Sequence, residues 1–305
     1  MSKTATLPPP GPNQAYCLVS ALQGGHLTFA LGSFLQDCTE PPVRAPSLSF
    51  LLRHSSRPSS DTHLLYDLGL RKTYDAYSPP VQTFATQCPI DVPLDVADAL
   101  AHEGSLPPGA IKNILLSHPH WDHVGTHASF PNATFYLGAD ARPLLEGGYP
   151  KDPTSVIAQD DVPLERTTFL DSSSDKWKPI GPFERALDYW GDGSLYVVDT
   201  PGHCSGHLAL LARTSADGGW VLLSGDCAHD HRLIAGEAKI AHLRDAEGNV
   251  VFCAYSDVPR AEETFAKLKK LAGMDRVRTI IAHDVNWELE NRGTRAFWPG
   301  TIESL

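Results

Sequence analysis

Three histidines and one aspartate lie within six consecutive residues of this 305-residue chain, in the stretch Ser117-His118-Pro119-His120-Trp121-Asp122-His123. Neutral imidazole and carboxylate are ligands for zinc, iron and manganese. Histidines this close together would repel one another if protonated, whereas a metal ion binds them in the neutral form. The alternative is that they are packing or surface histidines, but the density of ligand types makes a metal site the better interpretation.

The order of residues within this cluster favours two metal ions over one. His118 and His120 alternate along the chain, so both can face the same ion. Asp122 and His123 lie further on and can turn toward a second ion. A single tetrahedral zinc with one open position needs only three protein ligands. The cluster therefore already offers more than half of a two-metal set.

The cluster directly follows an apolar run at 111–116, which is typical of a buried strand. In open α/β sheets, sites form on loops at the carboxyl ends of strands. Three further ligand-type residues, His203, Asp226 and His283, also follow the ends of expected strands. Each alone would be an ordinary loop residue. Together with the cluster they form a set of seven candidates, which coincidence does not explain.

The elements that must position these residues alternate between strand-like and helical segments. Val92 to Glu103 has helical spacing, and Ala261 to Ala272 is amphipathic, with glutamates near its start and lysines near its end. Further strands are expected at 16–22, 27–35, 47–53, 63–68, 133–137, 194–199, 207–211, 220–223 and 279–282. This order suits a sheet sandwich covered by helices.

Two segments lack regular patterning. Residues 1–14 are rich in proline and are expected to form an irregular arm, with residues 15–305 forming a single domain. Residues 150–192 are rich in Asp, Ser and Pro and are expected to be an irregular insertion that either lines the site or is a surface loop. Trp121 and Trp287 adjoin ligand segments and either wall an apolar pocket or pack in the core.

The composition excludes some partners. The formal net charge is −11, and a negative surface repels nucleic acid and anionic lipids. Six cysteines without a C-x-x-C motif are expected to be reduced thiols. No apolar stretch reaches the length of a membrane span, and no signal peptide is evident. We therefore expect a cytoplasmic protein that binds neither nucleic acid nor membrane, and its oligomeric state stays open.

These motifs resemble those of the metallo-β-lactamase superfamily over most of the chain. The resemblance implies an α/β fold, the αββα sandwich of that superfamily, with the metals at the edge between the two sheets. It implies His118, His120 and His203 on the first metal, Asp122, His123 and His283 on the second, and Asp226 bridging both.

Two further roles follow from the resemblance. The stretch Tyr66-Asp67-Leu68-Gly69 is similar to the first motif of the superfamily, which implies that Asp67 supports the ligand loop without binding metal. His207, four residues after His203, is implied to be structural.

Within the superfamily, the chain is similar to quorum-quenching lactonases and, equally, to fungal lactamases that open cyclic carbamates or lactams. The pair His283-Asp284 matches the last motif of the lactonases. Those lactonases commonly carry, three residues after the bridging Asp, a Tyr that donates a hydrogen bond to the substrate carbonyl. Here that position is His229, whose imidazole can also donate. The resemblance thus implies a hydrolase with two divalent ions, zinc or else iron or manganese, and a small-molecule carbonyl substrate.

The expected mechanism is attack of a metal-bridging hydroxide on the carbonyl, because divalent ions lower the pKa of bound water from 15.7 to about 7. Asp122 is the candidate that carries the proton to the leaving group. One alternative is a glyoxalase-type thioesterase, which shares the full ligand set. Another is a mononuclear iron dioxygenase acting on persulfides, with His118, His203 and Asp226 on one metal.

Overall fold

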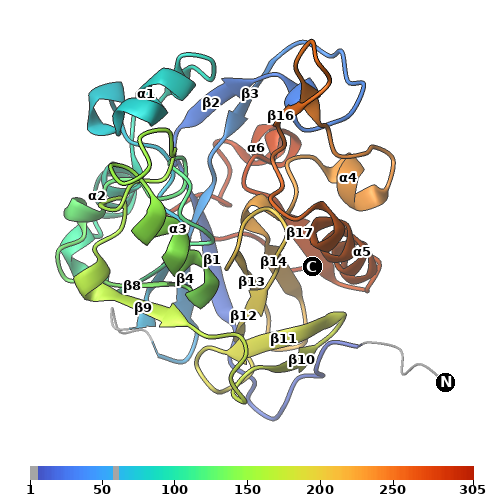
Figure 1. The fold of residues 1–305 in the computed structure, drawn as a ribbon. Coiled ribbons are helices and arrows are strands. Elements are labelled where there is room, and N and C mark those ends of the chain that lie inside the picture. The colour runs from blue at the N-terminus through green and yellow to red at the C-terminus, as the bar shows by residue number, and fades with distance from the viewer. Residues whose placement is uncertain (1–5, 58–61) are drawn as a thin grey trace.

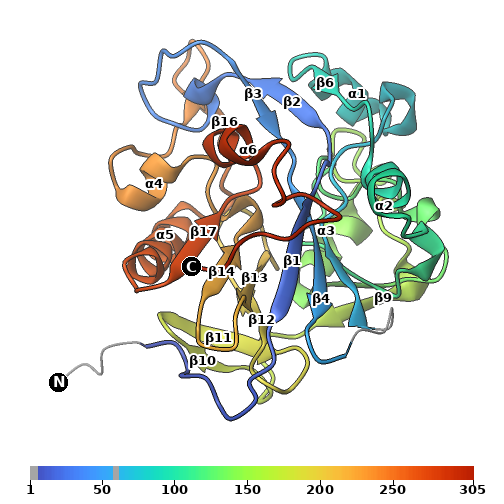
Figure 2. The same ribbon diagram turned by 180° about the vertical axis from the view of Figure 1, so that it is seen from behind.

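Two large sheets face one another in the computed structural model, which describes residues 6–57 and 62–305 (Figure 1). Helices cover the outer face of each sheet, as the view from behind also shows (Figure 2). This is the expected αββα sandwich. No helix in the described part of the chain combines the length and apolar character needed to cross a membrane.

The first sheet is mixed. Its strands β5, β7, β8 and β9 run parallel to one another, and β4 pairs antiparallel with both β1 and β5. In spatial order the sheet contains β1 (Cys17–Leu22), β4 (Ser49–His54), β5 (Leu64–Tyr66), β7 (Asn113–Leu115), β8 (Thr134–Gly138) and β9 (Thr167–Leu170).

The second sheet is antiparallel except at one edge, where β17 pairs parallel with β14. In spatial order it contains β10 (Lys178–Ile180), β11 (Phe183–Asp188), β12 (Leu195–Asp199), β13 (Leu208–Arg213), β14 (Trp220–Leu223) and β17 (Val277–Ile280). Smaller sheets are formed by β3 (Val43–Pro46), β2 (His26–Phe29) and β6 (Ile90–Asp91), and by β15 (Leu243–Arg244) with β16 (Val250–Phe252).

The helices of the described chain are α1 (Pro79–Ala85), α2 (Val96–Gly104), α3 (Arg142–Gly147), α4 (His231–Ala235), α5 (Val258–Ala272) and α6 (Val285–Asn291). Helix α5 begins three residues before the expected segment, because Asp257 caps it by accepting a hydrogen bond from the Arg260 backbone N–H. Helix α2 begins after Asp95, which forms a capping box with Asp98.

Strand β13 shows how the core is divided between the two faces of the second sheet. Leu208, Leu210 and Ala212 pack in the cluster between the sheets, whereas Ala209 and Leu211 pack in the cluster that includes α5. This alternation follows from the two-residue period of side chains along a strand. A third cluster joins α2 and α3 to the outer face of the first sheet.

Two expectations about elements were wrong. The expected strand at 27–35 ends at Phe29 and continues as a short 3-10 turn, Leu31–Ser33. Leu31 and Leu35 are buried in the core, and the half-buried Phe34 packs on His229. The segment 150–192 is not wholly irregular, because it contains β9, β10 and β11.

The proline-rich N-terminus is partly outside the described residues, which begin at residue 6. From there to residue 14 the chain has no helix or strand, and the Pro8 carbonyl accepts a hydrogen bond from Arg213. The division into an arm and a single domain stays a prediction.

Candidate metal centre

The seven predicted ligands come from loops that follow strands of both sheets. The loop after β7 carries His118 to His123, and the loop after β12 carries His203. Asp226 lies in the short turn Gly225–Cys227 after β14, and His283 follows β17. The side chains of these residues lie in two neighbouring groups.

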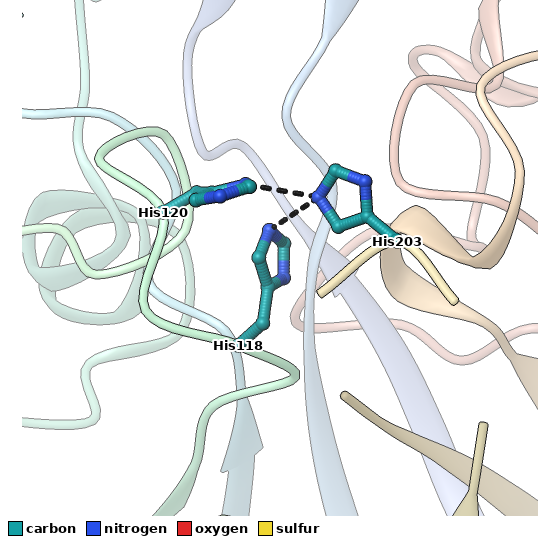
Figure 3. Close-up of side chains that lie close together, drawn as sticks. All are labelled: His118, His120 and His203. Carbon is teal, nitrogen blue, oxygen red and sulfur yellow. Dashed lines mark hydrogen bonds between the residues drawn. The ribbon is translucent and has the colours of Figure 1, made fainter. Parts of the chain in front are cut away.

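The first group contains three histidines whose ring nitrogens converge (Figure 3). Nε2 of His203 lies 3.1 Å from Nε2 of His118 and 2.9 Å from Nδ1 of His120. Burial lowers the pKa of His120 to about 4, so its ring is neutral at pH 7. Three neutral imidazoles facing one point form a set of ligands that suits a divalent ion.

The second group contains Asp122, His123, Asp226 and His283. Nε2 of His123 lies 3.3 Å from Oδ2 of Asp226, and Nε2 of His283 lies 3.4 Å from Oδ1 of the same carboxylate. Nε2 of His283 is also 3.5 Å from Oδ2 of Asp122. The arrangement offers two nitrogens and two carboxylates to one ion.

The carboxylate of Asp226 lies between the two groups. Its Oδ2 is 3.7 Å from Nε2 of His203 and 3.9 Å from Nε2 of His118, in addition to its contacts with the second group. Gly225 has φ +52°, and a Cβ there would lie 2.8 Å from Cβ of Ser117, so only glycine permits this close turn. The position agrees with the bridging role implied by the resemblance.

Histidines of both groups are oriented by hydrogen bonds on the ring side that faces away from the centre. Each of these acceptor oxygens carries no hydrogen, so Nδ1 must donate, and in the neutral ring Nε2 is then left without a proton and can bind a metal ion. The three pairs are His123 Nδ1 with Oδ2 of Asp67 (2.9 Å), His203 Nδ1 with the Ala254 carbonyl (2.7 Å), and His283 Nδ1 with the Pro46 carbonyl (2.7 Å).

Asp67 organises the ligand loop from beneath. It is fully buried and accepts hydrogen bonds from the backbone N–H of Ser117 (2.6 Å) and from its hydroxyl (2.8 Å). The Ser117 hydroxyl in turn lies 2.9 Å from Nδ1 of His118. Because that hydroxyl donates to Asp67, it accepts from His118, whose Nε2 is thereby left bare. Asp67 contacts the ligand loop but belongs to neither ligand group.

Two buried atoms at the centre have no hydrogen-bond partner within the described protein: Nε2 of His123 and Oδ1 of Asp226. Leaving a buried polar atom unpaired is costly. Burial opposes the charged form of His283, but the carboxylates of Asp226 and Asp122 outweigh this effect and raise its pKa to about 10. The centre therefore attracts positive charge, and its nitrogen and oxygen donors fit divalent metal ions.

A cavity of about 470 Å³ opens beside the two groups and is mainly apolar. Trp121 lines it, whereas Trp287 does not: it packs beside Phe50 in the core between the sheets. Among the described residues that line the cavity there is no lysine or arginine. The apolar lining comprises Leu27, Phe29, Phe34, Phe84, Trp121, Leu144, Val156, Ile157, Phe252 and Ala254.

These wall residues come from segments far apart in the sequence. Val156 and Ile157 belong to the segment 150–192, which therefore contributes to the cavity. Phe34 and Phe252 were not anticipated as site residues. Phe34 directly follows the 3-10 turn Leu31–Ser33, and Phe252 ends the short strand β16. No spacing in the sequence connects them with the ligands.

His229, the candidate hydrogen-bond donor, lies beside the two groups. Its Nε2 is 3.3 Å from Oδ2 of Asp226, and its ring stacks on Phe34 with centroids 4.3 Å apart. Its Nδ1 is 3.0 Å from the hydroxyl of Tyr255. Sequence reasoning missed Tyr255, because an isolated tyrosine in an irregular segment gives no signal.

His207 and Cys227 support the turn that carries Asp226. Nε2 of His207 accepts a hydrogen bond from the Asp226 backbone N–H (3.1 Å), and its Nδ1 lies 2.9 Å from the hydroxyl of Thr200. Burial lowers the pKa of His207 to about 3, so it stays neutral. Burial raises the pKa of the Cys227 thiol to about 12, which keeps it protonated at pH 7. These contacts agree with the structural role implied for His207.

The chain belongs to the metallo-β-lactamase superfamily, whose family model matches residues 44–283. The matched region contains all seven candidate ligands, from His118 to His283.

Particular relatives are similar over different extents. Gamma-lactamase FDB1 of Fusarium pseudograminearum is 35% identical over 193 residues, covering 61% of this chain and 46% of that protein. Cytochrome P450 monooxygenase mpaDE of Penicillium roqueforti is 30% identical over 280 residues, covering 85% of this chain and 32% of that protein. The chain thus spans less than half the length of either relative.

Solved structures show the same fold. A mutant of AiiA from B. thuringiensis, with N-decanoyl-L-homoserine bound at its active site, superposes with a TM-score of 0.69. It is 18% identical to this chain, and the match covers 93% of this chain and 98% of that one.

Proposed function

We propose that the chain is a di-metal hydrolase that opens a cyclic ester or amide. The observation that carries this proposal is that two ligand groups meet at Asp226 beside an apolar cavity. The proposed ligands are His118, His120 and His203 for the first ion, Asp122, His123 and His283 for the second, and Asp226 for both. The similarity to a gamma-lactamase and to a lactonase fold supports the same reaction class.

When bound, two divalent ions supply a shared hydroxide at neutral pH and a Lewis acid for the substrate carbonyl. Zinc suits this set of nitrogen and oxygen donors, and iron and manganese also use it. The net reaction adds one water across the ring C–O or C–N bond of the substrate. The product is a hydroxy acid or an amino acid.

Two side chains of the cavity have proposed roles in handling protons and charge. Asp122 takes up a proton at its carboxylate and delivers it to the leaving oxygen or nitrogen. His229 donates a hydrogen bond from Nε2 to the substrate oxygen on which negative charge develops. Both residues line the cavity beside Asp226.

The cavity distinguishes between the two hydrolase alternatives. A glutathione thioester carries carboxylates, and the cavity lining within the described chain offers no lysine or arginine to pair with them. A buried anion without a partner is strongly disfavoured. The apolar walls instead suit a neutral, largely apolar ring, which favours a lactone or lactam over a thioester.

The test is to load the purified chain with zinc and to compare kcat/KM for apolar lactones, apolar lactams and a glutathione thioester. We expect ring opening to exceed thioester hydrolysis by at least about tenfold, the scale of discrimination that a pocket of this kind provides. The His203→Gln variant, which lacks a ligand of the first group, is expected to lose this activity. Faster thioester hydrolysis, or equal ring opening without metal, would contradict the proposal.

We also propose that the substrate is a small molecule. A cytoplasmic location and the absence of nucleic-acid and membrane partners stay predictions from charge and composition.

A further inference from the structure

The ring of His229 is held in the opposite way to the rings of its neighbours. His123, His203 and His283 each present Nδ1 to an oxygen that can only accept a hydrogen bond. Nδ1 of His229 instead faces the hydroxyl of Tyr255, 3.0 Å away, which can both donate and accept. The proton on His229 therefore depends on which way this hydroxyl points.

A second hydrogen bond settles that direction. The backbone N–H of His229 lies 3.2 Å from the same Tyr255 oxygen and can only donate to it. If Nδ1 also carried a proton, both groups would donate to this oxygen. The single phenol hydrogen would then have no acceptor among the described residues, although the Tyr255 side chain is only 3% exposed. Such a buried, unpaired donor is disfavoured, so the phenol donates to Nδ1.

We propose that Tyr255 is a positioning residue that holds His229 in the tautomer with its proton on Nε2. His229 is then a hydrogen-bond donor beside Asp226 and not a further metal ligand. The identity of the group that receives this hydrogen bond, the carbonyl oxygen of a cyclic ester or amide, rests on the proposed function.

The distinction matters because geometry alone would permit His229 to bind metal. His203, Asp226 and His229 offer donor atoms within 4.8 Å of one another. A protonated Nε2 has no lone pair for a metal ion, so the hydrogen bond from Tyr255 excludes this grouping. The Phe34 ring stacks on the imidazole with an interplanar angle of 14° and fixes its plane.

The first test is nitrogen NMR of the zinc-loaded protein with labelled histidine, in which His229→Gln identifies the His229 signals by their loss. We expect Nε2 of His229 to be protonated in the parent protein and both tautomers to be populated in Tyr255→Phe. A bare or zinc-bound Nε2 in the parent protein would overturn the proposal. This measurement needs no substrate, so it can be interpreted even if the protein opens no lactone or lactam.

The second test is metal retention against a chelator. We expect His229→Gln and Tyr255→Phe to retain the same number of ions as the parent protein, with affinities within about twofold. His203→Gln, which lacks a proposed ligand, should lose metal under the same conditions. Loss of an ion from His229→Gln would show that His229 is a ligand and would refute the assignment.

The third test is a double-mutant cycle on kcat. If Tyr255 acts through His229, Tyr255→Phe should lower kcat in the parent protein but cause no further loss in the His229→Gln background. Tyr66→Phe is the matched control: Tyr66 is also a buried phenol, but it donates to the Leu208 carbonyl and does not contact His229. Its effect should be the same in both backgrounds. Equal losses from Tyr255→Phe in both backgrounds would mean a merely structural role.

Discussion

Asp67 lies outside both ligand groups, yet it controls the orientation of two histidines. It accepts a hydrogen bond from Nδ1 of His123 directly. It is linked to His118 through the Ser117 hydroxyl, which donates to Asp67 and accepts from Nδ1 of His118. A carboxylate in this position sets which nitrogen of each imidazole is bare. The negative charge also balances part of the charge that two bound cations would bring.

We predict that Asp67→Asn lowers metal affinity about 10- to 100-fold, the usual cost of losing a partner of a metal ligand. An amide has only one acceptor oxygen, whereas Asp67 accepts through both of its oxygens, so in either orientation the NH₂ group of the asparagine would face a donor of Ser117 or His123. Affinity is measured by competition with a coloured chelator. Asp245→Asn, which alters a partly exposed carboxylate outside the ligand groups, is the control. A metal affinity of Asp67→Asn equal to that of the parent protein would contradict the role given to Asp67.

The candidate ligands could be found from the sequence because each stands directly after an apolar strand. The carboxyl ends of parallel strands meet at one edge of a sheet, so His203, Asp226 and His283, which all follow strands of the second sheet, could be expected to lie close together despite their separation. Tyr255 and Phe34 could not be found in this way. Their contacts with His229 depend on how irregular loops fold back, and no periodicity encodes that path.

At the scale of elements, the hydrophobic patterns predicted which helices and strands form more reliably than they predicted where each one begins and ends. Helix α5 lies where its apolar spacing predicts, and β12, β13 and β14 follow three compact apolar runs. The prediction of a continuous strand at 27–35 was wrong, because apolar residues in a short turn can be as well buried as those in a strand. The segment 150–192 was misjudged because β9, β10 and β11 are short and partly exposed.

Helix α5 also supplies a test of the packing. Leu268 is fully buried against the outer face of the second sheet, so Leu268→Ala should lower the free energy of unfolding by about 2–5 kcal/mol. Lys270, two residues further along the helix, is exposed and provides the control. Lys270→Ala should change the free energy of unfolding by less than about 0.5 kcal/mol. Denaturant unfolding measures both, and equal effects would mean that α5 does not pack as described.

At the scale of the whole molecule, the candidate metal centre joins the two halves of the sandwich. His118, His120, Asp122 and His123 follow a strand of the first sheet, and the other candidate ligands follow strands of the second. Bound ions would therefore connect the sheets at their edge. A ligand that binds only the folded chain stabilises it by mass action.

We predict that the stabilisation of the folded chain by bound metal increases with pH. In the metal-free chain, the pKa of His283 is about 10, above the value of about 6.5 expected in the unfolded chain. This proton contributes stability fully below about pH 6.5, and the contribution is lost as the pH rises to about 10. With metal bound, the ligands must be deprotonated, so stabilisation by metal increases with pH.

The measurement is Tm with and without chelator between pH 6 and 9. The difference between the loaded and the metal-free protein should grow as the pH rises. A difference that stays constant or shrinks would mean that the ions do not displace protons from these side chains.

The parallel strand β17 brings in His283, the last of the candidate ligands along the sequence. During synthesis, the cluster at 118–123 leaves the ribosome long before Asp226 and His283 do. A nascent chain therefore exposes only a partial set of donors, from which an ion can readily escape. On the proposed function, binding of the second ion is then a late event in maturation, and a chain truncated before β17 should fail to acquire that ion.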